Sequence, residues 1–195
     1  MSTAETGIDG RIGDRIRALR AERGLTLDGL ARQADVSRAM LSRIERGESS
    51  PTAQLLVKVC GGLGTTLSAL FAAAEAPAAG PLSRRADQPT WRDPGSGYLR
   101  RNVSPPGGGS AVEVVEVEFP PGGGVSFDNR RVAGADQHVW VLDGTLELDV
   151  GGEAFRLETG DCLVMRFGRP VAFRNPSARP VRYAVIVGRG GARSA

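Results

Sequence analysis

The spacing of hydrophobic residues divides the chain into two parts with different periods. From residue 12 to residue 71, apolar side chains recur three to four positions apart, which is the period of an amphipathic helix. Glycines interrupt the pattern at short intervals, and a serine or threonine stands where several helices would begin. The pattern predicts five short helices with these inward positions: Ile12, Ile16 and Leu19; Leu27, Leu30 and Ala31; Leu41 and Ile44; Leu55, Leu56 and Val59; and a last helix from Thr65 to Phe71.

From residue 98 onward the period falls to two, as in strands that bury one face. Asp143-Gly144, between two alternating runs, predicts a β-hairpin, and Gly151-Gly152 predicts a second tight turn. About eight short strands with glycine and proline turns predict an all-β sandwich or barrel. The chain is therefore predicted to be multidomain, with these parts: a disordered N-terminus over 1–10, an all-α domain over 11–75, a linker over 76–97, a β domain over 98–188 and a tail over 189–195.

Composition excludes several classes of protein. Hydrophobic residues make up 41% of the chain, enough for packed cores, but no apolar run is long enough to cross a bilayer. The first residues are polar and acidic, so we expect no signal peptide, no membrane contact and a cytoplasmic location. Cys60 and Cys162 lie far apart, which predicts no disulfide and two small buried hydrophobes. His138 is the only histidine, which argues against a metal cofactor and against general-base catalysis.

Residues 25–47 resemble the helix-turn-helix of the phage-repressor/Cro-type (XRE) family. The string VSRAMLSRIERG at residues 36–47, followed by SPT at residues 50–52, carries the resemblance, which covers about residues 11–72. It implies a five-helix, sequence-specific DNA-binding domain whose third helix enters the major groove. It also implies an ion pair between Arg20 and Glu45. Leu27 departs from the family, which often has a phosphate-contacting glutamine at this position.

The outward face of the third helix carries the candidate DNA contacts. Apolar residues orient this helix, and the face left open consists of Ser37, Arg38, Ala39, Ser42 and Arg43. Arg38 and Arg43 are expected to pair with guanine, and phosphate contact is the alternative. Ser37 and Ser42 are expected to hold phosphates near the helix N-terminus.

Two copies of the chain are expected on the DNA. The helical segment, residues 1–75, carries ten basic and nine acidic side chains, so its bulk charge favours only weak binding to a long duplex. One domain reads too few base pairs for genomic specificity, because each correct pair contributes only about 1–3 kcal/mol. We therefore expect a homodimer on two half-sites about 10 base pairs apart.

Residues 98–188 resemble a small jelly-roll barrel of the cupin family. The strings QHVWVLDGTLEL at 137–148, LETGD at 157–161 and RNP at 174–176 carry the resemblance. Metal-binding cupins place histidines and a carboxylate at positions that fall here on residues 130–133, Gln137 and Val171. An amide is a poor transition-metal ligand and an arginine repels a dication, so the resemblance implies a barrel without metal.

Strand parity predicts what the barrel interior contains. The inward set, which is either an apolar pocket for a small effector or a packed core, consists of Gln137, Val139, Val141, Val171 and Phe173. Arg130 and Arg131, if they reach the mouth, could hold a carboxylate or a phosphate. His138 and Trp140 point the opposite way and are expected to pack against the helical domain or a second subunit.

Together these features predict a dimeric transcriptional regulator that binds double-stranded operator DNA and uses a metal-free cupin as a sensor or dimerisation module. An antitoxin-like autoregulator that binds a partner protein is one alternative. The other is a metal-dependent cupin enzyme fused to a DNA-binding domain, because iron-dependent epoxidases occur among helix-turn-helix–cupin proteins.

Overall fold

The computed structural model describes residues 7–74, 80–105, 110–128, 135–166 and 168–189. The five expected helices are present: α1 (Ile8–Glu22), α2 (Leu27–Ala34), α3 (Arg38–Glu45), α4 (Ala53–Leu63) and α5 (Leu67–Ala73). In α2 to α5 a side-chain hydroxyl accepts a hydrogen bond from the backbone N–H three residues further on; these caps are Thr26, Ser37, Thr52 and Thr66. Helix α1 begins at Ile8, within the segment that was expected to be disordered.

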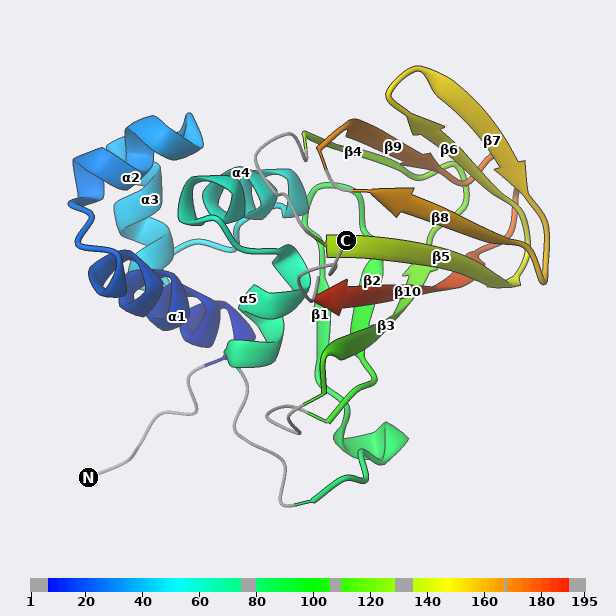
Figure 1. Cartoon of the computed structure of the whole chain (residues 1–195), viewed down its shortest axis with the longest axis horizontal. Helices are drawn as coiled ribbons and strands as arrows, with labels where there is room; N and C mark the ends of the chain where they lie inside the picture. Colours follow the sequence, from blue (N-terminus) through cyan, green and yellow to red (C-terminus); the bar gives the residue numbers. More distant parts are fainter. Residues whose placement is uncertain (1–6, 75–79, 106–109, 129–134, 167, 190–195) are drawn as a thin grey trace, which may run out of the picture.

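The strands of the described residues form two antiparallel sheets. After a short 3₁₀ turn, η1 (Arg85–Asp87), the strands are β1 (Thr90–Arg92), β2 (Leu99–Asn102), β3 (Val112–Phe119), β4 (Gly124–Asp128), β5 (Ala135–Asp143), β6 (Leu146–Val150), β7 (Glu153–Leu157), β8 (Cys162–Arg166), β9 (Pro170–Arg174) and β10 (Val181–Arg189). One sheet has the order β1-β2-β3-β10-β5-β8 and the other β4-β9-β6-β7. Figure 1 shows the sheets stacked at one end of the molecule and the helices at the other. This is the barrel that the cupin resemblance implies.

Alternation along the strands fills the space between the two sheets. In β3 the buried side chains Val115, Val117 and Phe119 lie opposite β10, whose Tyr183 and Val185 are also buried. Exposed or half-buried residues occupy the intervening positions of β3. The alternation with a period of two thus turns one face of β3 inward.

The predicted hairpin at Asp143-Gly144 is wrong. Strand β5 belongs to the six-stranded sheet and β6 to the four-stranded sheet, so the turn carries the chain from one sheet to the other. Gly144 has φ +95°, and a Cβ at this position would lie 3.3 Å from the Cα of Val181. A glycine at a crowded corner gives the same local signal as a hairpin turn, because both require positive φ. The turn at Gly151-Gly152 does join a hairpin, β6–β7.

The linker expected over residues 76–97 is also corrected. Its described part, residues 80–97, contains η1 and β1, and β1 pairs with β2. Trp91, in the middle of β1, is only 4% exposed and packs against Phe71 and Tyr98 with ring centroids 5.3 and 6.0 Å away. A strand of three residues is too short for periodicity to detect, and burial of one large aromatic side chain compensates for its length.

Candidate DNA interface and interdomain cavity

Helices α2 and α3 form the scaffold of the candidate DNA interface. Asp35, in the left-handed conformation with φ 53° and ψ 52°, follows α2, and Ser37 caps α3 two residues later. Helix α1 packs closely behind them. A Cβ added to Gly13 of α1 would lie only 2.2 Å from the backbone oxygen of Ile44 in α3, so the glycine permits this close approach. Tight packing of this kind leaves α3 a single orientation.

The predicted DNA contacts lie on the side of α3 that its buried residues Leu41 and Ile44 leave open. Four are exposed and one is half-buried: Ser37, Arg38, Ala39 and Arg43 in the first group, and Ser42 in the second. A guanidinium nitrogen of Arg43 lies 4.0 Å from the sulfur of Met40.

Two of these side chains have polar partners that the sequence analysis missed. The Nε of Arg38 lies 3.1 Å from an oxygen of Asp28, and both side chains are about two-thirds exposed. Arg46 donates to the hydroxyl of Ser42 and pairs with Glu48 at 2.6 Å. Exposed ion pairs of this kind contribute about 0–1 kcal/mol and exchange readily, so they leave Arg38 available for DNA. The one-turn spacing of Ser42 and Arg46 was the available signal.

The ion pair implied by the family resemblance is present. Arg20 contacts both carboxylate oxygens of Glu45, at 2.7 and 2.8 Å, and the Glu45 side chain is only 6% exposed. This hydrogen bonding raises the pKa of Arg20, so its guanidinium stays charged. Arg17 also donates to the backbone oxygen of Glu45. The carboxylate of Glu45 is therefore held against α1 rather than beside the candidate DNA contacts.

Leu27 is half-buried and packs against the hydrophobic core. An apolar side chain in this place donates no hydrogen bond, so the phosphate contact that the family often makes here is missing from this chain.

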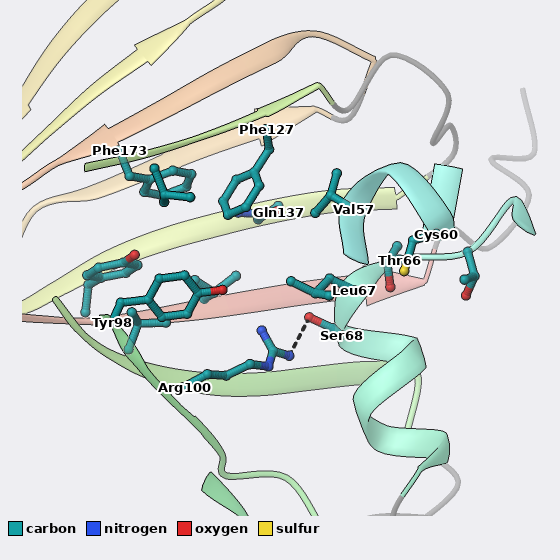
Figure 2. Close-up of a pocket in the computed structure, with 15 residues that line it drawn as sticks. Val57, Cys60, Thr66, Leu67, Ser68, Tyr98, Arg100, Phe127, Gln137 and Phe173 are labelled. Carbon is teal, nitrogen blue, oxygen red and sulfur yellow. Dashed lines mark hydrogen bonds between the residues drawn. The ribbon is translucent and has the colours of Figure 1, made fainter. Parts of the chain in front are cut away.

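A cavity of about 70 Å³ lies where α4 and α5 meet the end of the barrel (Figure 2). The helical side of its wall consists of Val57, Cys60, Thr65, Thr66, Leu67 and Ser68. The strands supply aromatic and aliphatic side chains together with Arg100 and Gln137. Ligand sites commonly combine an apolar lining with a few polar groups in this way.

The predicted interior residues divide between this cavity and the core. Gln137 and Phe173 line the cavity, as Figure 2 shows. Val139, Val141 and Val171 are buried and face inward, but they are not among the residues that line the cavity and belong to the packed part of the barrel. Parity identifies the inward face of a strand but not the level at which packing leaves a space. Arg130 and Arg131 lie outside the described residues.

Direct contacts join the helices to the barrel. A guanidinium nitrogen of Arg100, on β2, donates to the Ser68 hydroxyl at 3.0 Å, and the guanidinium lies 4.9 Å from the ring centroid of Phe71 on α5. The buried carboxylate of Asp93 accepts a hydrogen bond from the backbone N–H of Ala53 at 2.8 Å, at the start of α4. The sequence analysis missed Arg100, although its two-residue spacing from Tyr98 places both on one face.

Burial keeps three titratable side chains of the cavity wall protonated. It raises the pKa of the Cys60 thiol to about 12 and raises the pKa values of Tyr98 and Tyr183 above their ordinary range. The positive charge of Arg100 opposes all three shifts without cancelling them. At neutral pH these groups are therefore uncharged donors.

The outer face of the larger sheet carries the only histidine of the sequence. His138 is exposed, and Trp140, two positions along β5, is 47% exposed. Cys162 is exposed as well, which corrects the expectation that both cysteines are buried. Within the described part of the chain, no three His, Cys, Asp or Glu side chains come together in a group that could hold a metal ion. None of the helices described is long and apolar enough to span a membrane.

Comparison with known proteins identifies the family. Residues 16–70 match the helix-turn-helix family, and residues 115–187 match the cupin domain family. Over 175 residues the chain is 30% identical to the HTH-type transcriptional regulator SutR of Escherichia coli (strain K12), a match that covers 88% of this chain and 91% of that protein. The chain belongs to the helix-turn-helix transcriptional regulators with a cupin domain.

Two further relatives of this helix-turn-helix–cupin regulator are informative. The immunity repressor protein of Bacillus phage phi105 is 44% identical over 59 residues, which are 30% of this chain and 41% of that protein. The crystal structure of an HTH_3 family transcriptional regulator from Vibrio cholerae matches with a TM-score of 0.74 and 24% identity, over 95% of this chain and 98% of that one. The regulator therefore shares its fold with the Vibrio protein across both domains.

Proposed function

We propose that this regulator recognises operator DNA through α3 as a homodimer, and that its cupin domain is a sensor without enzymatic activity. The observation that carries the proposal is the exposed face of the capped helix α3, which rests on a buried ion pair and a close helix contact. A helix held this firmly presents its side chains in one register, as sequence reading in the major groove requires.

The residues of that face divide by chemistry. Arg38 and Arg43 have the planar donor groups that pair with guanine edges. Ser37 and Ser42 donate to phosphates and so position the helix. Ala39 is small and exposed, so it allows close approach to the groove. Two such helices, related by a two-fold axis, would read half-sites about one helical turn apart.

The test of operator recognition begins with selection of bound genomic fragments by the purified protein. Arg38→Ala and Arg43→Ala should each weaken specific binding by about 1–3 kcal/mol and relax the base preference at one position, as measured by titration and footprinting. Arg156→Ala, which removes a similarly exposed arginine from β7, is the matched control and should bind as the wild type does. If both α3 variants keep the wild-type affinity and footprint, α3 does not read the base sequence.

The non-enzymatic part of the proposal rests on the donors present. Gln137 contributes an amide to the cavity where metal-binding cupins have a carboxylate, and His138 faces outward. Neither arrangement suits a transition metal. Elemental analysis of the purified protein should find less than stoichiometric iron, manganese or zinc; a stoichiometric metal would support the enzyme alternative instead.

A further inference from the structure

The cavity between α4, α5 and the barrel has walls from both domains of the chain. Leu67 and Ser68 belong to α5, which packs against α1, whereas Arg100 and Phe173 belong to the barrel. Helix α4, which supplies Val57, packs against α2 of the candidate DNA interface. A molecule in this cavity would therefore touch the sensor and the DNA-binding unit at the same time (Figure 2).

Arg100 supplies the charge of the cavity wall, since the carboxylate of Asp93, which also acts on Tyr98, is not among the lining residues. Arg100, only 5% exposed, is the single ionised side chain among the described lining residues, and no Asp or Glu occurs in that set. Its guanidinium remains protonated at any physiological pH. Its influence extends across the cavity, because its charge acts on Cys60, Tyr98 and Tyr183. One cation in an apolar enclosure favours a ligand with one negative charge.

The remaining lining defines the rest of the ligand. Thr66, Ser68 and Tyr98 contribute hydroxyls to the lining and Gln137 contributes an amide, while Phe127 and Phe173 offer apolar surface. The volume of about 70 Å³ is roughly half of the ~150 Å³ of an apolar cavity that accepts benzene. A ligand of about three or four heavy atoms fits such a space.

We propose that this cavity binds a small monocarboxylate, whose carboxylate pairs with Arg100 and accepts a hydrogen bond from the Ser68 hydroxyl of α5, and whose short hydrocarbon part lies against the phenylalanines. This inference rests on the proposed function and adds the chemical class of the effector to it. The bound carboxylate bridges β2 and α5 beside the existing contact between Arg100 and Ser68, so it changes the position or rigidity of α5 on the barrel. Operator affinity then changes by a factor equal to the ratio of the ligand's affinities for the free and the DNA-bound protein.

The experiment uses the full-length protein and four probes: formate, acetate, propionate and butyrate, each paired with its neutral primary amide. Calorimetric titration and thermal unfolding are measured for each member. At least one carboxylate should bind and raise Tm, and its amide should not. Absence of binding by all four carboxylates, or equal binding of acid and amide, would overturn the proposal.

Variants separate the binding site from general stability. Arg100→Gln should weaken carboxylate binding by about tenfold or more, whereas Arg100→Lys, which keeps the charge, should weaken it less. If Arg100→Gln does not fold, Tyr98→Phe replaces it in the test. This variant retains the ring and removes one hydrogen-bond donor, so it should also weaken carboxylate binding. Arg101→Gln is the control, because Arg101 is the next residue on β2 and is not part of the cavity wall. Equal losses in Arg101→Gln and Arg100→Gln would contradict the assignment.

A second readout distinguishes this inference from the proposed function. Operator affinity is measured with and without the bound carboxylate, and a change should appear in the wild type and disappear in Arg100→Gln. An operator affinity that is the same with and without the bound carboxylate would overturn the coupling and leave DNA recognition intact. Failure to bind any operator would instead contradict the proposed function.

Discussion

At the scale of single residues, three buried groups make stability depend on alkaline pH. Cys60 has a pKa raised to about 12, and Tyr98 and Tyr183, the two tyrosines of the sequence, have raised pKa values too. Between the unfolded and the folded pKa the native state holds more protons than the unfolded chain. The free energy of unfolding therefore falls as pH rises above about 9 to 10, by about 1.4 kcal/mol per pH unit for each group.

Tyr183→Phe tests this linkage because phenylalanine keeps the ring and does not titrate. The variant should lose stability less steeply with pH than the wild type, in urea unfolding followed between pH 8 and pH 11. Cys162→Ser, at an exposed cysteine, should retain the wild-type slope. Identical slopes for wild type and Tyr183→Phe would show that Tyr183 ionises in the folded protein as easily as in the unfolded one.

Residue identities predicted some positions of the site and not others, for a physical reason. The caps Thr26 and Ser37 act within their own helix, so local sequence contains all that determines them. Arg100 and Ser68 lie 32 positions apart in different domains, so their contact depends on how the domains pack. Pairing of Arg38 with Asp28 depends likewise on the crossing of two helices.

At the scale of elements, the Arg20–Glu45 pair fastens α1 to α3. Glu45→Gln should lower the free energy of unfolding by about 2–3 kcal/mol, because it leaves the largely buried Arg20 charge without a carboxylate. Urea denaturation measures the loss. Glu48→Gln breaks a pair whose side chains are both 51% exposed and should cost less than about 1 kcal/mol. Equal losses of unfolding free energy in the two variants would mean that the buried pair stabilises the protein no more than an exposed pair does.

The five helices were predictable because each has an apolar stripe, and four of them also begin at a side-chain cap. The sheets were less so, because pairing is decided between distant segments. Gly144 indicated a turn correctly but not that the turn joins two sheets. Trp91 lies in a three-residue edge strand whose sheet neighbour is β2, and its side chain packs on Phe71 of α5, so distant segments decide its structure.

At the scale of the whole molecule, one outer surface remains apolar. Trp140 on β5 and Val164 on the edge strand β8 are 47% and 60% exposed, and His138 pairs in register with Val164. Large apolar side chains gathered on an open sheet face mark an interaction surface more often than isolated ones do. Since the proposed operator recognition uses two copies of the chain, we expect this surface to join the two subunits.

Trp140→Glu should abolish the dimer, because a carboxylate in an apolar interface cannot be desolvated without a partner. A buried tryptophan contributes about 2 kcal/mol or more to such an interface, so the dissociation constant should rise by at least about thirtyfold in sedimentation equilibrium. Operator affinity should fall with it, while binding to a single half-site should not change. Leu82→Glu introduces the same charge at a side chain that is 65% exposed outside both sheets and should leave the dimer intact. A Trp140→Glu protein that still dimerises would assign the subunit contact to another surface. If a second polypeptide co-purifies with the wild type and is lost in Trp140→Glu, the antitoxin-like alternative is favoured.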